Sequence, residues 1–166
     1  MPVFSFATAI KKGPTVKPPR IVLMGVEGVG KSTAGAQMDA PIFLCSEDGL
    51  VGPQFRDTAH FSAADWEQVL GFLDYLLDNP HPYKSLVVDT VDWLEPKLYH
   101  FICKRDGEKD IESYGFGKGY TAAATEFRKF VRRLDSLNRK GMAVLVLAHT
   151  QVKAFNNPTG ENYDRY

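Results

Sequence analysis

The chain has 166 residues, 44% hydrophobic and 24% charged, and its 20 basic and 20 acidic residues give a formal net charge of zero. This composition is typical of one globular domain, and the balanced charge argues against a wholly basic, DNA-coating surface while leaving room for local patches. Two isolated cysteines, no apolar run of membrane-spanning length and no signal-peptide pattern predict a cytoplasmic protein with free thiols and no membrane partner. The four histidines lack zinc-ligand spacing, so no zinc is expected.

The chain begins with residues 1–19, which are rich in proline and lysine and which we interpret as an N-terminal arm. The apolar run Ile21–Met24 follows and predicts a strand. Residues 25–32 then read Gly-Val-Glu-Gly-Val-Gly-Lys-Ser and fit the G-x-x-x-x-G-K-[ST] pattern of a phosphate-binding loop. Residues 33–38 can begin a helix, so the loop has the flanking strand and helix that this pattern requires.

The residue types of this loop suit phosphate binding. Glycines let backbone N–H groups turn towards phosphate oxygens, and the following helix points its N-terminus at the same anion. We expect Lys31 to reach the β- and γ-phosphates of a nucleotide and the Ser32 hydroxyl to bind Mg²⁺. The alternative is an ordinary glycine-rich turn with a surface lysine, which the flanking elements disfavour. The predicted nucleotide-binding residues are Gly25, Val26, Glu27, Gly28, Val29, Gly30, Lys31, Ser32 and Thr33.

Three further apolar runs predict strands at Ile42–Cys45, Leu86–Val88 and Met142–Ala148. All four runs are almost continuously apolar, which is typical of strands buried on both faces of a parallel sheet.

Helical patterns lie between these strands. One begins at Ser62, with Asp65 at capping-box spacing, and ends at Pro80. A second is expected from about Asp92 to Lys104, and a third carries apolar residues of 127–137 on one face and basic residues elsewhere. Alternating strands and helices predict an α/β fold with right-handed crossovers, in which ligands bind at the carboxyl ends of the strands.

The predicted strand ends carry polar groups. Asp89 follows the third strand, in the manner of a Walker B aspartate, and is expected to hold Mg²⁺ opposite Ser32. For the nearby Asp92 and Glu95, we favour the role of helix N-terminal carboxylates over metal binding.

Two more strand ends supply candidates for catalysis. Glu47 or Asp48, after the second strand, could orient and deprotonate an attacking water, and we favour Glu47 over a solvated turn residue. His149, after the fourth strand, either senses the γ-phosphate through a hydrogen bond or is a neutral histidine bonded to backbone. The predicted catalytic residues are Lys31, Glu47 and His149, and the predicted metal ligands are Ser32 and Asp89.

The order of these motifs resembles that of the RecA-like ATPases. The resemblance rests on the phosphate loop, on Phe43–Glu47 with its terminal glutamate, on Leu86–Thr90, and on the polar end of the last strand. It implies a three-layer αβα core over residues 20–155, ATP rather than GTP, Mg²⁺, and Glu47 as the catalytic glutamate. The chain looks most like the compact bacteriophage members that act in recombination or single-strand annealing, which would place it in a bacterial cytoplasm.

RecA-like proteins keep two loops near bound DNA, and the matching segments here are 104–120 and 151–158. Both mix basic, aromatic and small residues, as single-strand binding requires, but the first carries four acids, so solvated loops remain the alternative. The resemblance also implies more sheet beyond the last strand. We therefore interpret residues 156–166 as a flexible tail or the start of a truncated loop. By the resemblance, the missing part would supply basic groups that act on a neighbour's nucleotide in a homo-oligomer, so slow or absent hydrolysis by this chain alone is expected.

The sequence therefore predicts a Mg²⁺-dependent ATP-binding protein, and by resemblance an ATPase that serves phage DNA recombination, repair or annealing. Two alternatives stay open: a small-molecule or nucleotide kinase, whose phosphate loop would look the same, and a nucleotide-gated binding protein with little turnover.

Overall fold

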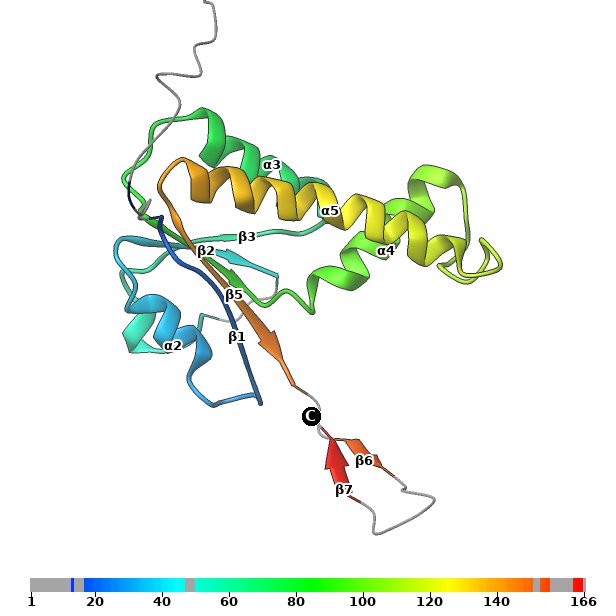
Figure 1. Cartoon of the computed structure of the whole chain (residues 1–166), viewed down its shortest axis with the longest axis horizontal. Helices are drawn as coiled ribbons and strands as arrows, with labels where there is room; N and C mark the ends of the chain where they lie inside the picture. The colour runs from blue at the N-terminus through cyan, green and yellow to red at the C-terminus, as the bar shows by residue number, and fades with distance from the viewer. Residues whose placement is uncertain (1–12, 14–16, 47–49, 151–152, 156–162, 166) are drawn as a thin grey trace, which may run out of the picture.

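Figure 1 shows the computed structural model of the chain, which describes residue 13 and residues 17–46, 50–150, 153–155 and 163–165. Five parallel strands form one sheet in the spatial order β1-β5-β4-β2-β3. The strands are β1 (Arg20–Gly25), β2 (Pro41–Cys45), β3 (Ala59–Ser62), β4 (Ser85–Asp89) and β5 (Ala143–His149). The helices are α2 (Lys31–Ala36), the 3-10 helix η1 (Pro53–Phe55), α3 (Trp66–Asp78), α4 (Leu94–Asp106) and α5 (Lys118–Arg139).

Helices cover both faces of the sheet, with α2 on one face and α3, α4 and α5 on the other (Figure 1). Side chains of neighbouring positions alternate between the two faces, as they do in any strand. In β2, Ile42 and Leu44 belong to the large core under α3, α4 and α5, whereas Phe43 and Cys45 belong to the smaller core on the α2 side. The predicted α/β fold with a mainly parallel sheet is confirmed.

The strand β1 is less buried than its sequence predicts. We expected Ile21–Met24 to be covered on both faces, but β1 lies at the edge of the sheet, and Val22 and Met24 are 64% and 62% exposed. The six-residue helix α2 is too short to cover this edge. The expectation of a doubly buried first strand was therefore wrong.

The start of α3 also differs from the prediction. Ser62 is the last residue of β3, a strand that the sequence pattern did not predict, and α3 begins only at Trp66. Asp65 caps the helix, because its carboxylate accepts a hydrogen bond of 2.8 Å from the backbone N–H of Gln68. The helix thus uses Asp65, and not Ser62, as its N-cap.

The end of the described chain forms a small second sheet. Strand β6 (Lys153–Phe155) pairs antiparallel with β7 (Tyr163–Arg165). No helix in the described part of the chain is long and apolar enough to cross a membrane.

Candidate nucleotide-binding site

The phosphate-binding loop joins the end of β1 to the start of α2. Gly28 and Gly30 have φ angles of 76° and 96°, a left-handed conformation that glycine adopts without the steric cost of a Cβ. Gly30 is the N-cap of α2, and its carbonyl accepts the first helical hydrogen bond from Ala34 at 3.0 Å. The two glycines therefore give the loop the backbone turns that a phosphate cradle needs.

Lys31 is the first residue of α2 and is held inside the loop. It is only 6% exposed, and its Nζ donates hydrogen bonds of 3.0 Å to the carbonyl oxygens of Gly25 and Val26. A buried ammonium group is costly unless it is hydrogen-bonded, so these carbonyls fix its position. The structure thus places one positive charge at the concave side of the loop.

Asp89 and Ser32, the two predicted metal ligands, lie close together in the structure. Asp89 ends β4, is 8% exposed, and accepts a hydrogen bond from the Ser32 side chain. Burial raises the pKa of Asp89 above its ordinary value, and this effect outweighs the Ser32 hydrogen bond and the nearby charges of Lys31 and His149. A desolvated carboxylate beside a hydroxyl is an oxygen donor set that fits Mg²⁺.

His149 ends β5, which lies between β1 and β4. In the strand register it pairs with Gly25 at the start of the phosphate loop, and the next residue, Thr150, donates its N–H to the Gly25 carbonyl at 3.2 Å. The partner of the imidazole is a carboxylate and not the backbone, because Nδ1 lies 2.8 Å from Oδ2 of Asp92. Among the described residues, the ring therefore bonds a carboxylate and no backbone group, while its proposed role towards the γ-phosphate stays a prediction.

Asp92 does not lie in the first turn of α4, where we expected it. The helix begins at Leu94, with Trp93 at its N-cap, and Asp92 belongs to the turn after β4. Its Oδ1 accepts a hydrogen bond of 3.0 Å from the backbone N–H of His149, 57 positions further along the chain. No local pattern could reveal this partner, since the two residues meet only when β4 and β5 pair.

Ser46 is a second residue that sequence reasoning overlooked. It is buried at the end of β2, and its Oγ donates to the Thr90 carbonyl at 2.8 Å and accepts from the Thr90 N–H at 3.0 Å. These bonds fasten the end of β2 to the residue that follows Asp89. Glu47 and Asp48 lie outside the described residues, so the predicted general base stays a prediction.

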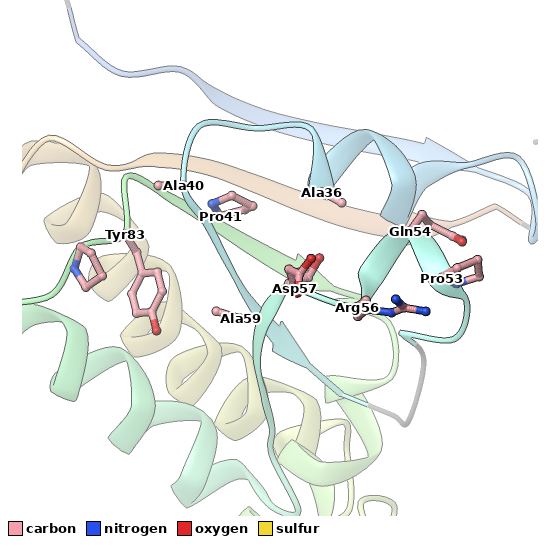
Figure 2. A pocket seen from close by; sticks show the side chains of 11 residues that line it. Ala36, Ala40, Pro41, Pro53, Gln54, Arg56, Asp57, Ala59 and Tyr83 are labelled. Carbon is pink, nitrogen blue, oxygen red and sulfur yellow. The ribbon is translucent and has the colours of Figure 1, made fainter.

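Two further hollows lie apart from the phosphate loop. One, of about 540 Å³, lies between α4 and α5 and is lined by Tyr99, Tyr120 and Phe127 together with Asp92. The other, of about 430 Å³, lies near the amino-terminal ends of β2 and β3, where Tyr83 and Gln54 stand on opposite sides (Figure 2). The second hollow is at the wrong end of the strands for a nucleotide bound on the loop.

In the described part of the chain no group of three or more histidine, cysteine or acidic side chains could hold a metal ion. A magnesium site of the proposed kind does not need such a group, because Mg²⁺ usually keeps several waters and uses one or two protein ligands with the phosphates of the substrate.

A parallel α/β sheet with this loop at the end of its edge strand defines a P-loop NTPase domain. A family model described as an AAA domain matches residues 17–166, and the chain belongs to this family. The membership supports a P-loop, AAA-type ATPase-like domain that binds a nucleotide. No curated protein matches the chain.

Proposed function

We propose that the protein is a Mg²⁺-dependent ATPase of the RecA-like type that acts on DNA in phage recombination, repair or single-strand annealing. The observation that carries the ATPase part is the convergence of Lys31, Ser32, Asp89 and His149 on the carboxyl ends of β1, β4 and β5. Each of these side chains has the chemistry that one part of a phosphoryl-transfer site requires.

Hydrolysis of ATP needs positioning and charge stabilisation more than covalent chemistry from the protein. The amides of Gly25–Thr33 and the Lys31 ammonium would hold the β- and γ-phosphates. Ser32 and Asp89 would hold Mg²⁺, which when bound neutralises charge on the phosphoryl oxygens. Glu47 would take the proton of the attacking water, and His149 would hydrogen-bond to the γ-phosphate.

The ATPase part is tested by measuring phosphate release and MgATP affinity with no other phosphate acceptor present. Hydrogen bonds to charged groups contribute about 1.5–3 kcal/mol, so Lys31→Ala should weaken MgATP binding by about 100-fold. Lys97→Ala is the matched control, because this half-buried lysine lies on α4 and, among the described residues, its side chain bonds only the Ala64 carbonyl. Glu47→Gln should keep the affinity and lose turnover.

Each contrary outcome points to a different conclusion. Unchanged affinity in Lys31→Ala would refute the site, and unchanged turnover in Glu47→Gln would refute the general base. Phosphate transfer that needs an organic acceptor would favour a kinase, and binding without turnover at any protein concentration would favour a nucleotide-gated binding protein.

The nucleic-acid part is supported by the outer face of α5. Arg128, Arg132 and Arg139 share this face and are exposed, and no ion pair joins them to any described residue. The two acidic residues of α5 are both engaged: Glu126 is buried and bonded to Arg105 and Lys129, and Asp135 is bonded to Arg20. A helix of 22 residues, about 33 Å long, thus carries uncompensated positive charge although the chain is neutral overall.

An exposed aromatic side chain lies just before this helix. Phe116 is fully exposed, has a φ of 49° and stands between Gly115 and Gly117. Aromatic side chains beside basic grooves are where single-stranded nucleic acids stack their bases. The acids of the same loop are partly engaged, since Glu112 accepts a hydrogen bond from Tyr120.

Binding of a fluorescent single-stranded oligonucleotide at several salt concentrations tests this part. The double variant Arg128→Glu/Arg132→Glu should weaken binding at least tenfold and make its salt dependence shallower, by about 0.7 in log–log slope for each lost phosphate contact. Arg56→Glu/Lys84→Glu, with the same charge change at residues that lie outside α5, next to η1 and β4, is the control. Equal loss in both double variants would indicate a general charge effect and refute a surface on α5.

A further inference from the structure

The turn after β4 is fastened to β5 at three points. The Val91 N–H donates to the Leu147 carbonyl at 2.9 Å, and the Asp92 carboxylate binds His149 twice, once at the backbone N–H and once at Nδ1. Asp92 therefore spans from the strand that carries Asp89 to the strand that carries His149. Neither the family match nor the motifs assign a role to this carboxylate.

The two Asp92 oxygens have different partners. Oδ1 accepts from the backbone N–H at 3.0 Å, and Oδ2 faces the ring Nδ1 at 2.8 Å. Burial alone would raise the pKa of Asp92, but the hydrogen bonds from His149 outweigh it and hold the pKa below its ordinary value. An ionised carboxylate only accepts hydrogen bonds, so Nδ1 must carry the hydrogen. The other ring nitrogen, Nε2, is then the atom left for the nucleotide.

The ring is also close enough to the proposed metal site for their charges to act on each other. His149 lowers the pKa of Asp89 through its charge, as Lys31 does, although burial dominates the net shift. We propose that Asp92 is a positioning residue that fixes the orientation and the tautomer of His149, so that Nε2 reports whether a γ-phosphate is present. This inference rests on the proposed ATPase function and adds a residue to it.

The carboxylate has a chemical consequence when ATP binds. With Nδ1–H held by Asp92, Nε2 can donate to the γ-phosphate only after it takes a proton from the solvent, and the resulting imidazolium lies between two anions, the carboxylate and the γ-phosphate. Both partners of the bond to the phosphate are then charged, whereas the neutral ring expected in the absence of the carboxylate would leave the charge on the phosphate alone. ADP has no γ-phosphate and gains nothing from this bond, so Asp92 should increase the preference for ATP.

The geometry offers a variant that separates this role from a merely structural one. In Asp92→Asn, the amide oxygen can keep the bond to the backbone N–H of His149, and the amide NH₂ then takes the place of Oδ2 opposite Nδ1. Because NH₂ donates, Nδ1 must become the acceptor and the hydrogen moves to Nε2. We therefore expect Asp92→Asn to keep the turn unchanged and to reverse the His149 tautomer. An aspartate-to-asparagine change in a serine-protease triad has the same effect on its histidine.

The experiment is ¹⁵N NMR of the histidine side chains at alkaline pH, where the rings are neutral, with His149→Gln used to assign the His149 signals. Wild type and Asp92→Glu should show a proton on Nδ1, and Asp92→Asn should show it on Nε2. In parallel, Asp92→Asn should lower the ratio of ATP to ADP affinity by about tenfold while the melting temperature stays within a few degrees. Asp92→Glu, which keeps a carboxylate, should restore part of that ratio.

The outcomes separate the possible failures. The same tautomer and the same affinity ratio in wild type and Asp92→Asn would overturn the positioning role. A reversed tautomer with an unchanged ratio would overturn the link to the γ-phosphate. If wild type binds no nucleotide, the proposed function fails. The tautomer measurement in the nucleotide-free protein still decides whether Asp92 determines the tautomer of the His149 ring.

Discussion

The bonds between Ser46 and Thr90 offer a quantitative test of how the candidate site is built. Both residues are buried, at 5% and 2% exposure, and the Ser46 hydroxyl serves the N–H and the carbonyl of Thr90. Ser46→Ala leaves a buried donor unsatisfied, which costs about 1–3 kcal/mol, and removes a hydrogen bond that contributes about 1 kcal/mol. We therefore expect a loss of about 3 kcal/mol in the free energy of unfolding.

This loss is large enough for routine measurement. For a chain of this size 1 kcal/mol corresponds to roughly 3 °C, so the melting temperature should fall by about 9 °C. Urea titrations should show a lower midpoint with an unchanged m-value. Ser136→Ala is the matched control, since its hydroxyl bonds only the Arg132 carbonyl on the exposed side of α5, and it should stay within about 0.5 kcal/mol. A decrease of less than about 2 °C in the melting temperature of Ser46→Ala would show that water satisfies the Thr90 N–H, and would refute the reasoning.

Two further predictions concern the packing of α2 and the metal site. A Cβ on Gly35 would lie 2.8 Å from a Val87 methyl carbon on the sheet, so Gly35→Ala should destabilise the protein by about 1–3 kcal/mol. In Gly71→Ala in α3, the added Cβ meets nothing within 4 Å, so this variant should be stabilised by about 0.5–1 kcal/mol. Equal melting temperatures for the two variants would contradict this packing. Ser32→Ala and Asp89→Asn should each raise the Mg²⁺ concentration needed for half-maximal nucleotide binding by about tenfold or more, as measured by titration at fixed ATP; a Mg²⁺ requirement that does not change would remove both residues from the metal site.

The sequence predicts most of the sheet because its central strands are short apolar runs with side chains buried on both faces. Leu86–Val88 is an example, fully buried in the structure as the pattern indicates. The phosphate loop can also be predicted from the sequence, because its glycines and its lysine lie within a few residues of each other. What local patterns do not encode is the order of the strands, and this is why β1 was expected to be buried on both faces although it lies at the edge of the sheet and is partly exposed.

The unpredicted features have the same physical origin. Strand β3 has only four residues, two of them polar, and borders a single neighbour, so it has no apolar run to detect. The pair of Asp92 with His149 joins the turn after β4 to the end of β5, two segments that are adjacent in space and far apart in sequence. From its sequence neighbours alone, Asp92 is explained as a carboxylate at a helix N-terminus. Its actual partner, His149, can be known only once β4 is seen to pair with β5.

The strand order also explains why His149 can take part in the site at all. Neighbouring strands lie about 4.8 Å apart, so placing β5 between β1 and β4 separates the phosphate loop from the Asp89 strand by about 10 Å. The end of β5 lies between them, and this places His149 between the phosphate loop and Asp89. If β1 and β4 were neighbours, β5 would lie outside this pair and His149 would lie to one side of the site. The edge position of β1 and the place of His149 between β1 and β4 are thus two results of one topology, in which Asp92 ties β5 to the strand that carries the proposed metal ligand.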